Sequence, residues 1–301
     1  MGRRGICCAR DASPHAADPH ESDRGGRIET DTLPYTLYLI LAELSLGGVI
    51  AMQFIDLRGG ATRGFIKATT IMLPLLLGLT FWVAFTLEGD VAEGYRIDAG
   101  PRDAIVVLLA VLTAGSVVHN ALLYRDRVRA GQVAGGVLAV LAVAVLLLTA
   151  IMLRIPVWGM GLLFLSLLTG SLVVGFAAAG LTLGHWYLVT PRLPPQPLNE
   201  VTALLIGLLI VQVLLFALAV ALPIDEAPLG GRDLPLREDV TFWLRIGVGF
   251  VLPLLFGWMA WSSSRIRSMM AATGLLYLVT ALVLAGEIAA RALLFDSGRP
   301  I

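Results

Sequence analysis

The chain has little charge for its length and almost no lysine or cysteine. Only 15% of its 301 residues are charged, a single lysine stands among 22 basic residues, and there are two cysteines. Soluble domains carry about a quarter charged residues, so this composition argues against one. Cys7 and Cys8 are adjacent and have no second cysteine pair, so they predict neither a disulfide framework nor a structural zinc site. The excess of arginine over lysine is typical of a GC-rich bacterial genome.

Several motifs of common enzymes and transporters are also missing. The sequence has no phosphate-binding glycine loop with lysine, no HExxH and no GxSxG, so nucleotide motors, zinc proteases and serine hydrolases lack support. We find no inverted repeat between the first and second halves of the sequence. Many secondary transporters have such a repeat, so its absence weakens the interpretation of this chain as one. Nothing predicts a nucleic-acid partner.

What fills the chain instead is a series of long apolar runs. A membrane span needs about 20 apolar residues, because the hydrocarbon core is about 30 Å thick. The runs predict an all-α, polytopic transmembrane bundle in residues 34–301, preceded by a disordered polar tail in residues 1–33. The eight predicted spans are Tyr35–Leu57, Phe65–Leu87, Ala104–Tyr124, Gly131–Leu153, Trp158–Val189, Val201–Leu222, Thr241–Trp261 and Met269–Leu294. Pro74 and Pro253 fall inside two of them and should kink these helices.

The loop charges predict how the bundle lies in the membrane. The loops after the first, third, fifth and seventh spans hold most of the basic residues, and the opposite loops are acidic. Basic loops remain in the cytoplasm, so we expect both termini outside. The basic residues are Arg58, Arg63, Lys67, Arg125, Arg127, Arg129, Arg192, Arg265 and Arg267.

One group of charged residues lies within the spans, toward the outer side. Glu43 is in the first span, Arg245 enters the seventh, and Glu287 and Arg291 are four residues apart on one face of the eighth. Charges inside a bilayer are costly, at about 3 kcal/mol or more, and are therefore paired or functional. We expect a neutral ion-pair network that holds these spans together; a proton path or a polar ligand pocket is the alternative.

A second polar group lies toward the cytoplasmic side. His119 and Asn120 are in the third span, and His185 and Tyr187 are near the end of the fifth. Histidine can bond a quinone carbonyl or ligate haem, but it also serves as an interface anchor. A two-haem cytochrome would need four histidines where the spans have two. Small residues along the fifth span predict close packing that turns His185 inward, so these four residues predict a cavity for a quinone headgroup.

The eighth span carries a family resemblance. The stretch from Gly286 through Glu287 and Arg291 to Phe295 resembles a Gly-Glu…Arg…Phe signature of dimethyl-sulfoxide-reductase membrane anchors. This group also includes the polysulfide-reductase membrane subunits. The resemblance implies an eight-helix subunit that interacts with quinone beside an iron–sulfur subunit. It assigns Glu287 and Arg291 a structural role.

These observations predict an integral subunit of a bacterial redox complex in the cytoplasmic (inner) membrane. It would interact with quinone or quinol, lie in the lipid bilayer and contact an iron–sulfur or cytochrome subunit. We expect no catalytic residue and no metal site in the chain itself. A permease for a small molecule or ion, and a structural or assembly subunit without a ligand, are the alternatives.

Overall fold

The computed structural model describes residues 19–87, 97–98, 100–153, 159–190, 192–221 and 238–297. This part of the chain is helical, with short turns between the helices and no strand. The elements are α1 (Pro19–Arg58), α2 (Arg63–Thr70), α3 (Leu73–Thr86), α4 (Arg102–Tyr124), α5 (Val128–Met152), α6 (Gly159–Val189), α7 (Gln196–Ala221), α8 (Val240–Leu244), the π-helical η2 (Arg245–Val251), α9 (Leu252–Arg265) and α10 (Met269–Ser297).

Eight helical stretches in the described residues are long and apolar enough to cross a membrane, which confirms the predicted all-α bundle. Their bounds are Leu33–Arg58, Arg63–Thr86, Arg102–Tyr124, Val128–Met152, Met160–Val189, Gln196–Ala221, Val240–Arg265 and Met269–Phe295. They follow the predicted spans closely because the length of an apolar run is a local property that needs no knowledge of the packing.

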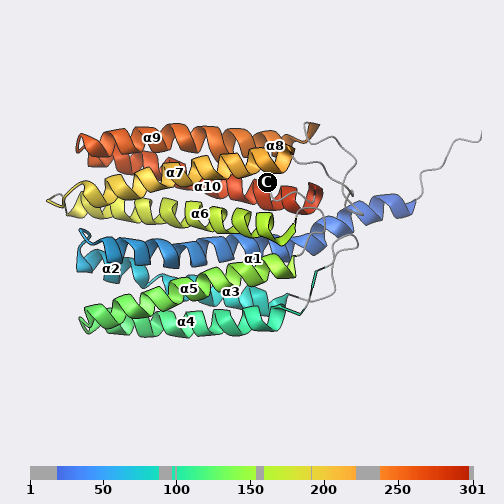
Figure 1. The fold of residues 1–301 in the computed structure, drawn as a ribbon. Coiled ribbons are helices and arrows are strands. Elements are labelled where there is room, and N and C mark those ends of the chain that lie inside the picture. The colour runs from blue at the N-terminus through green and yellow to red at the C-terminus, as the bar shows by residue number, and fades with distance from the viewer. Residues whose placement is uncertain are drawn as a thin grey trace, which may run out of the picture.

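The helices form two groups that lie side by side (Figure 1). The first contains α1, α2–α3, α4 and α5, and the second contains α6, α7, α8–α9 and α10. Within each group every helix packs against its neighbour in the chain, and the last helix returns to the first. The most extensive contact between the groups is that of α1 with α6, so these two helices form the centre of the bundle.

Close approach of α1 and α6 depends on glycine. A Cβ atom on Gly47 would lie 1.8 Å from the backbone oxygen of Ser171, and a Cβ on Gly175 would lie 2.2 Å from the oxygen of Gly47. Both contacts are with backbone atoms, which cannot turn away as a side chain can. Small residues give membrane helices this kind of close contact, so the predicted tight packing of the fifth span is present.

The two intramembrane prolines interrupt their helices. The second span divides at Ile71–Met72 into α2 and α3, with Pro74 in the first turn of α3. The seventh span contains the π-helical turn η2 just before Pro253, where the Leu252 N–H bonds to Gly247 five residues back. Proline cannot donate a backbone hydrogen bond, so the helix before it must find other partners.

The beginning of α1 differs from the prediction. A disordered tail was expected up to residue 33, but α1 already starts at Pro19; residues 1–18 lie outside the described residues. Extending an existing helix costs far less than starting one, so the apolar span can continue backward into polar sequence. Figure 1 shows this first part of α1 projecting beyond the bundle.

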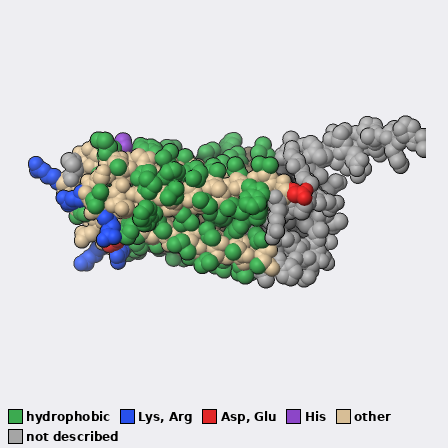
Figure 2. Space-filling model, turned by 90° about the horizontal axis from the view of Figure 1, so that it is seen from above, with side chains coloured by type: hydrophobic (Ala, Val, Ile, Leu, Met, Phe, Trp, Pro, Cys, Tyr) green, Lys and Arg blue, Asp and Glu red, His purple; other side chains and the backbone are tan. Residues whose placement is uncertain are grey.

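The surface of the bundle is zoned along its length. Hydrophobic side chains cover the middle, and the Lys and Arg side chains gather at one end (Figure 2). That end carries the turns that join α1 to α2, α4 to α5, α6 to α7 and α9 to α10 (Figure 1). The end of α10 and the start of α1 lie toward the opposite end.

Candidate functional site

The structure brings the four charged residues of the spans together in the core. Arg291 on α10 bridges two carboxylates: its Nη2 lies 2.8 Å from Glu43 Oε1 and 3.2 Å from Glu287 Oε2. The Nη1 atom of Arg245 lies 3.1 Å from Glu287 Oε1. All four side chains are buried, with exposed fractions of 2% or less. The cluster therefore joins α1, η2 and α10 inside the bundle with no net formal charge.

Glu287 is the best-satisfied member of this cluster. Besides Arg245 and Arg291 it accepts a hydrogen bond from Gln212 Nε2 on α7, at 2.6 Å. The sequence analysis missed Gln212. It is the only polar side chain in the apolar stretch 203–221, which is the signal that could have identified it.

Glycines make the space that the cluster occupies. A Cβ on Gly170 of α6 would lie 2.8 Å from Glu43 Oε1 and 2.9 Å from Glu287 Oε2. Gly249 and Gly286 let η2 approach α10, where a Cβ on Gly286 would lie 2.4 Å from the Cα of Gly249. The guanidinium of Arg245 also stacks over the ring of Phe250, 4.3 Å from its centroid. The charged side chains are thus held on several sides, which favours a fixed geometry.

His119 bonds to the backbone of α5. Its Nδ1 lies 3.0 Å from the backbone oxygen of Gly131 on α5, and the ring is buried. Gln53 of α1 donates nearby to the backbone oxygen of Gln132, at 2.9 Å. A Cβ on Gly135 would meet both Gln53 and His119, so the three helices α1, α4 and α5 are locked here by polar contacts.

Asn120 is engaged with the break in the second span. Its Nδ2 donates to the backbone oxygen of Thr70 at 3.0 Å, and its Oδ1 accepts from the Thr70 hydroxyl at 2.9 Å. The Thr70 oxygen would normally accept from the N–H of residue 74, which is a proline. Asn120 therefore supplies the missing donor.

Tyr187 holds the connection between α6 and α7. It is buried, and its hydroxyl donates to the backbone oxygen of Pro194. This bond ties the segment before α7 to the last turn of α6. Helix α7 begins at Gln196, so Pro197 lies in its first turn. Proline is well tolerated in the first turn of a helix, because backbone N–H groups there have no acceptor within the helix.

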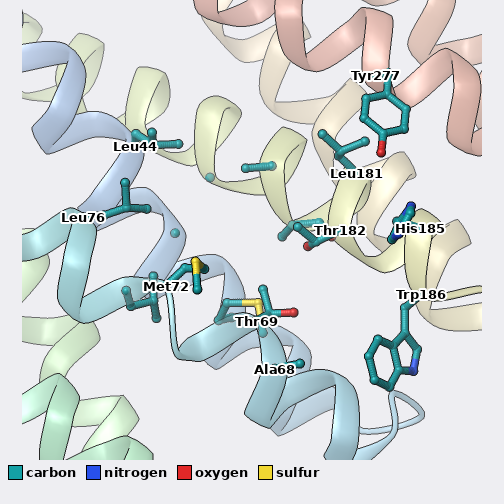
Figure 3. A pocket seen from close by; sticks show the side chains of 16 residues that line it. Leu44, Ala68, Thr69, Met72, Leu76, Leu181, Thr182, His185, Trp186 and Tyr277 are labelled. Carbon is teal, nitrogen blue, oxygen red and sulfur yellow. The ribbon is translucent and has the colours of Figure 1, made fainter.

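Of the four candidate quinone residues, His185 lines a cavity among the described residues. This cavity, of about 390 Å³, lies between α1, α2–α3, α6 and α10, and Figure 3 shows its lining. Its lining is mostly apolar, with Leu44, Met72 and Leu76 at one side. The polar side chains are Thr69, Thr182, His185, Trp186 and Tyr277.

The cavity opens to the surface that faces lipid. His185 and Thr182 are exposed on α6, and Tyr277 on α10 is 51% exposed. Trp186 forms the wall beside His185: its Nε1 donates to Thr62 at 3.0 Å, and its ring meets Phe65 edge-on. His185 lies four residues before the end of α6, about 6 Å along the helix axis, so the cavity begins near the basic end of the bundle.

The four residues that the sequence grouped together are divided in the described part of the structure. His119, Asn120 and Tyr187 are not among the residues that line this cavity. The expectation rested on a shared depth along the membrane normal. Depth does not fix the rotation of each helix. His119 is turned toward α5, and His185, which was expected to turn inward, is exposed on α6. The sequence did not predict three further lining residues: Thr69, Met72 and Tyr277. For Thr69 and Met72, the available signal was the helix break at Pro74.

Nothing in the described residues forms a metal centre: no three His, Cys, Asp or Glu side chains are grouped so as to hold an ion. His119 and His185 do not converge on one site, so paired ligation of a haem by these two imidazoles finds no support in their positions.

At the basic end, ion pairs join neighbouring loops. Arg58 lies 2.9 Å from Glu200, Arg63 lies 2.6 Å from Asp56, and Lys67 lies 2.7 Å from Asp126. The hydrogen bond from Lys67 lowers the pKa of the Asp126 carboxyl below its ordinary value. The pairs of Arg58 with Glu200 and of Lys67 with Asp126 each have an exposed member and contribute about 1 kcal/mol or less, whereas Asp56 is buried beside Arg63.

No family model, curated protein or solved structure matches this chain.

Proposed function

We propose that this chain is an integral membrane subunit that binds quinone or quinol in the cavity beside His185. The observation that carries the proposal is an apolar, lipid-facing cavity with a hydrogen-bonding imidazole at one end. Ligand pockets usually measure about 300–1,000 Å³ and combine apolar walls with a few polar groups. The 390 Å³ cavity falls in this range.

The chemistry of the lining favours an uncharged headgroup. None of the lining residues is a lysine, arginine, aspartate or glutamate. A phospholipid headgroup would need a cation for its phosphate. A quinone has two neutral carbonyl acceptors and an apolar tail, and a neutral imidazole can donate its N–H to one carbonyl.

The position of the cavity also suits a ligand that arrives through the membrane. Its opening toward lipid would let an isoprenoid tail remain in the bilayer while the headgroup lies at His185 and Thr182. We place the subunit in the bacterial cytoplasmic membrane, with its basic end inside. The electrons of the quinone reaction would pass to or from an iron–sulfur or cytochrome subunit bound to this chain.

Binding of a short-chain quinone to the protein in lipid nanodiscs tests the proposal. His185→Leu removes the imidazole and should weaken binding about tenfold, the equivalent of one lost hydrogen bond of about 1.4 kcal/mol. Ala178→Phe should block the cavity, because Ala178 is one of its lining residues. His119→Gln is the matched control, since an amide can still bond the Gly131 carbonyl. Equal affinities for all four proteins would refute a site at His185.

A further inference from the structure

Glu43 is held much less firmly than the other carboxylate of the buried cluster. Glu287 accepts hydrogen bonds from Gln212, Arg245 and Arg291. Glu43 has one ionic neighbour, Arg291 Nη2 at 2.8 Å, and this contact is not aligned as a hydrogen bond. Neither oxygen of Glu43 has a hydrogen-bond partner among the described residues, although the side chain is 1% exposed.

Other groups of the cluster also have free hydrogen-bonding capacity. Within the part of the chain that the structure describes, three buried donors have no acceptor: Arg291 Nε, Arg291 Nη1 and Arg245 Nε. In the same part, Gln212 Oε1 is a buried acceptor without a donor, and the buried hydroxyl of Ser171 has no partner. Buried polar groups in proteins are nearly always hydrogen-bonded. A ligand here must both donate and accept. An anion would meet the carboxylates and a cation would meet the guanidiniums, whereas water serves both.

The charged groups around Glu43 indicate which member of the cluster can gain a proton. The charged neighbours of Glu43 are Arg291 and Glu287 from α10 and Arg245 from η2. On α6 it meets Gly170, beside Ser171, and neither residue titrates. Tyr38 on α1 is bonded to Thr149 of α5. Guanidinium groups keep their proton in proteins, and three donors hold Glu287 ionised, so a proton that enters the cluster goes to Glu43.

We propose that the cluster binds internal water between Glu43 and the free nitrogens of Arg291, and that Glu43 is a proton-binding site in the core of the bundle. The water molecules would connect Glu43 to the Nε and Nη1 atoms that have no protein acceptor. Gly170 keeps any side chain of α6 out of the cluster, because a Cβ there would lie within 3.1 Å of polar atoms of Glu43, Glu287 and Arg291. The proposal does not depend on quinone binding and is tested on the protein alone.

Infrared difference spectroscopy of the protein in lipid, recorded during a pH titration, tests this assignment. The protonated carboxyl of Glu43 should give a C=O band that shifts in D₂O and titrates at a pH different from that of the exposed carboxylates. Glu43→Gln should abolish that band. Asp56→Asn, which changes another buried carboxylate of α1 that pairs with Arg63, should leave it in place.

A second variant and the wild-type titration give independent tests of the assignment to Glu43. Gly170→Ala should shift the band or remove it, because the new methyl group would lie 2.8 Å from Glu43 Oε1 and force the carboxylate to move. If Glu43→Gln does not fold, the wild-type titration still decides: carboxyl bands that all titrate together with the exposed acids would overturn the proposal. A separate band that survives Glu43→Gln would also overturn it.

Discussion

Asn120 and Thr70 exchange two hydrogen bonds between α4 and α2, immediately before the proline that breaks the second span. The amide nitrogen of Asn120 lies 3.0 Å from the Thr70 carbonyl, and the Thr70 hydroxyl lies 2.9 Å from the amide oxygen. Pro74 removes the N–H that this carbonyl would otherwise accept. An amide in the third span thus completes a backbone hydrogen bond that the second span cannot complete alone.

This relationship predicts a specific coupling between Asn120 and Pro74. Asn120→Leu should lower the free energy of unfolding by about 1–3 kcal/mol, because it leaves the Thr70 carbonyl and hydroxyl poorly satisfied in a buried place. In a Pro74→Ala background the loss should be smaller, since the substituted residue regains a backbone N–H that can bond the carbonyl. Unfolding in SDS titrations measures both costs; equal costs in the two backgrounds would show that the residues are not coupled.

Loss of an acidic residue from the charged cluster should lower the free energy of unfolding more than loss of a basic one. Glu287→Leu leaves two guanidiniums facing Glu43 alone and should cost about 3–5 kcal/mol of unfolding free energy. Arg245→Leu should cost less, because Glu43 can take up a proton when a positive charge is lost.

The double variant Glu287→Leu with Arg245→Leu keeps the Glu43–Arg291 pair, which is separated by 2.8 Å. It should be more stable than Glu287→Leu alone. The free energies of unfolding of the three variants, compared in one detergent, decide the matter. A double variant at least as unstable as the sum of the single losses would argue against ion pairing between these residues.

The crossing of α1 and α6 should tolerate no side chain at Gly47. Gly47→Ala would place a methyl group 1.8 Å from the backbone oxygen of Ser171 and should separate the two helix groups. We expect a loss of about 3 kcal/mol or more, at the upper end of overpacking effects. Gly207→Ala, with nothing within 4 Å of the added atom, is the control and should be neutral or slightly stabilising. Similar thermal stability of the two variants would contradict the tight crossing.

The orientation in the membrane predicts which loops a membrane-impermeant maleimide can reach. With Cys7 and Cys8 replaced by serine, Gly100→Cys should label in intact cells, and Ser268→Cys should label only after the membrane is opened. Ser268 lies in the turn between α9 and α10 at the basic end, and Gly100 lies before α4 at the other end. Neither change alters the charge of a loop. The reverse labelling pattern would place the termini in the cytoplasm.

The parts of the structure that the sequence predicts are those that depend on local pattern. The spans follow from the lengths of apolar runs, and Glu287 with Arg291 follows from a four-residue spacing along one helix. Glu43 and Arg245 were assigned to the same group from their depth and charge, because opposite charges in a bilayer must find one another. Gln212 carries no charge, so an argument from charged residues could not identify it.

The polar residues toward the basic end of the bundle were harder to place. His119 and His185 lie at similar depth, but one imidazole bonds the backbone of α5 and the other faces a lipid-side cavity. Which side of the bundle a residue faces depends on the rotation of its helix, and that rotation is set by contacts between distant segments. The contact of Gly47 with Ser171 and the carbonyl exposed at Thr70 are such contacts, and apolar periodicity does not reveal them.

Photo-crosslinking with an azido-quinone tests the quinone site most directly. The labelled protein is digested, and the modified residues are located by mass spectrometry. We predict adducts within residues 68–76 and 178–186, which line the cavity from its two sides, and we expect an excess of unmodified quinone to prevent them. Adducts spread over the lipid-facing surface that unmodified quinone does not suppress, or suppressible adducts confined to the contact of α4 with α5, would contradict a quinone site at His185.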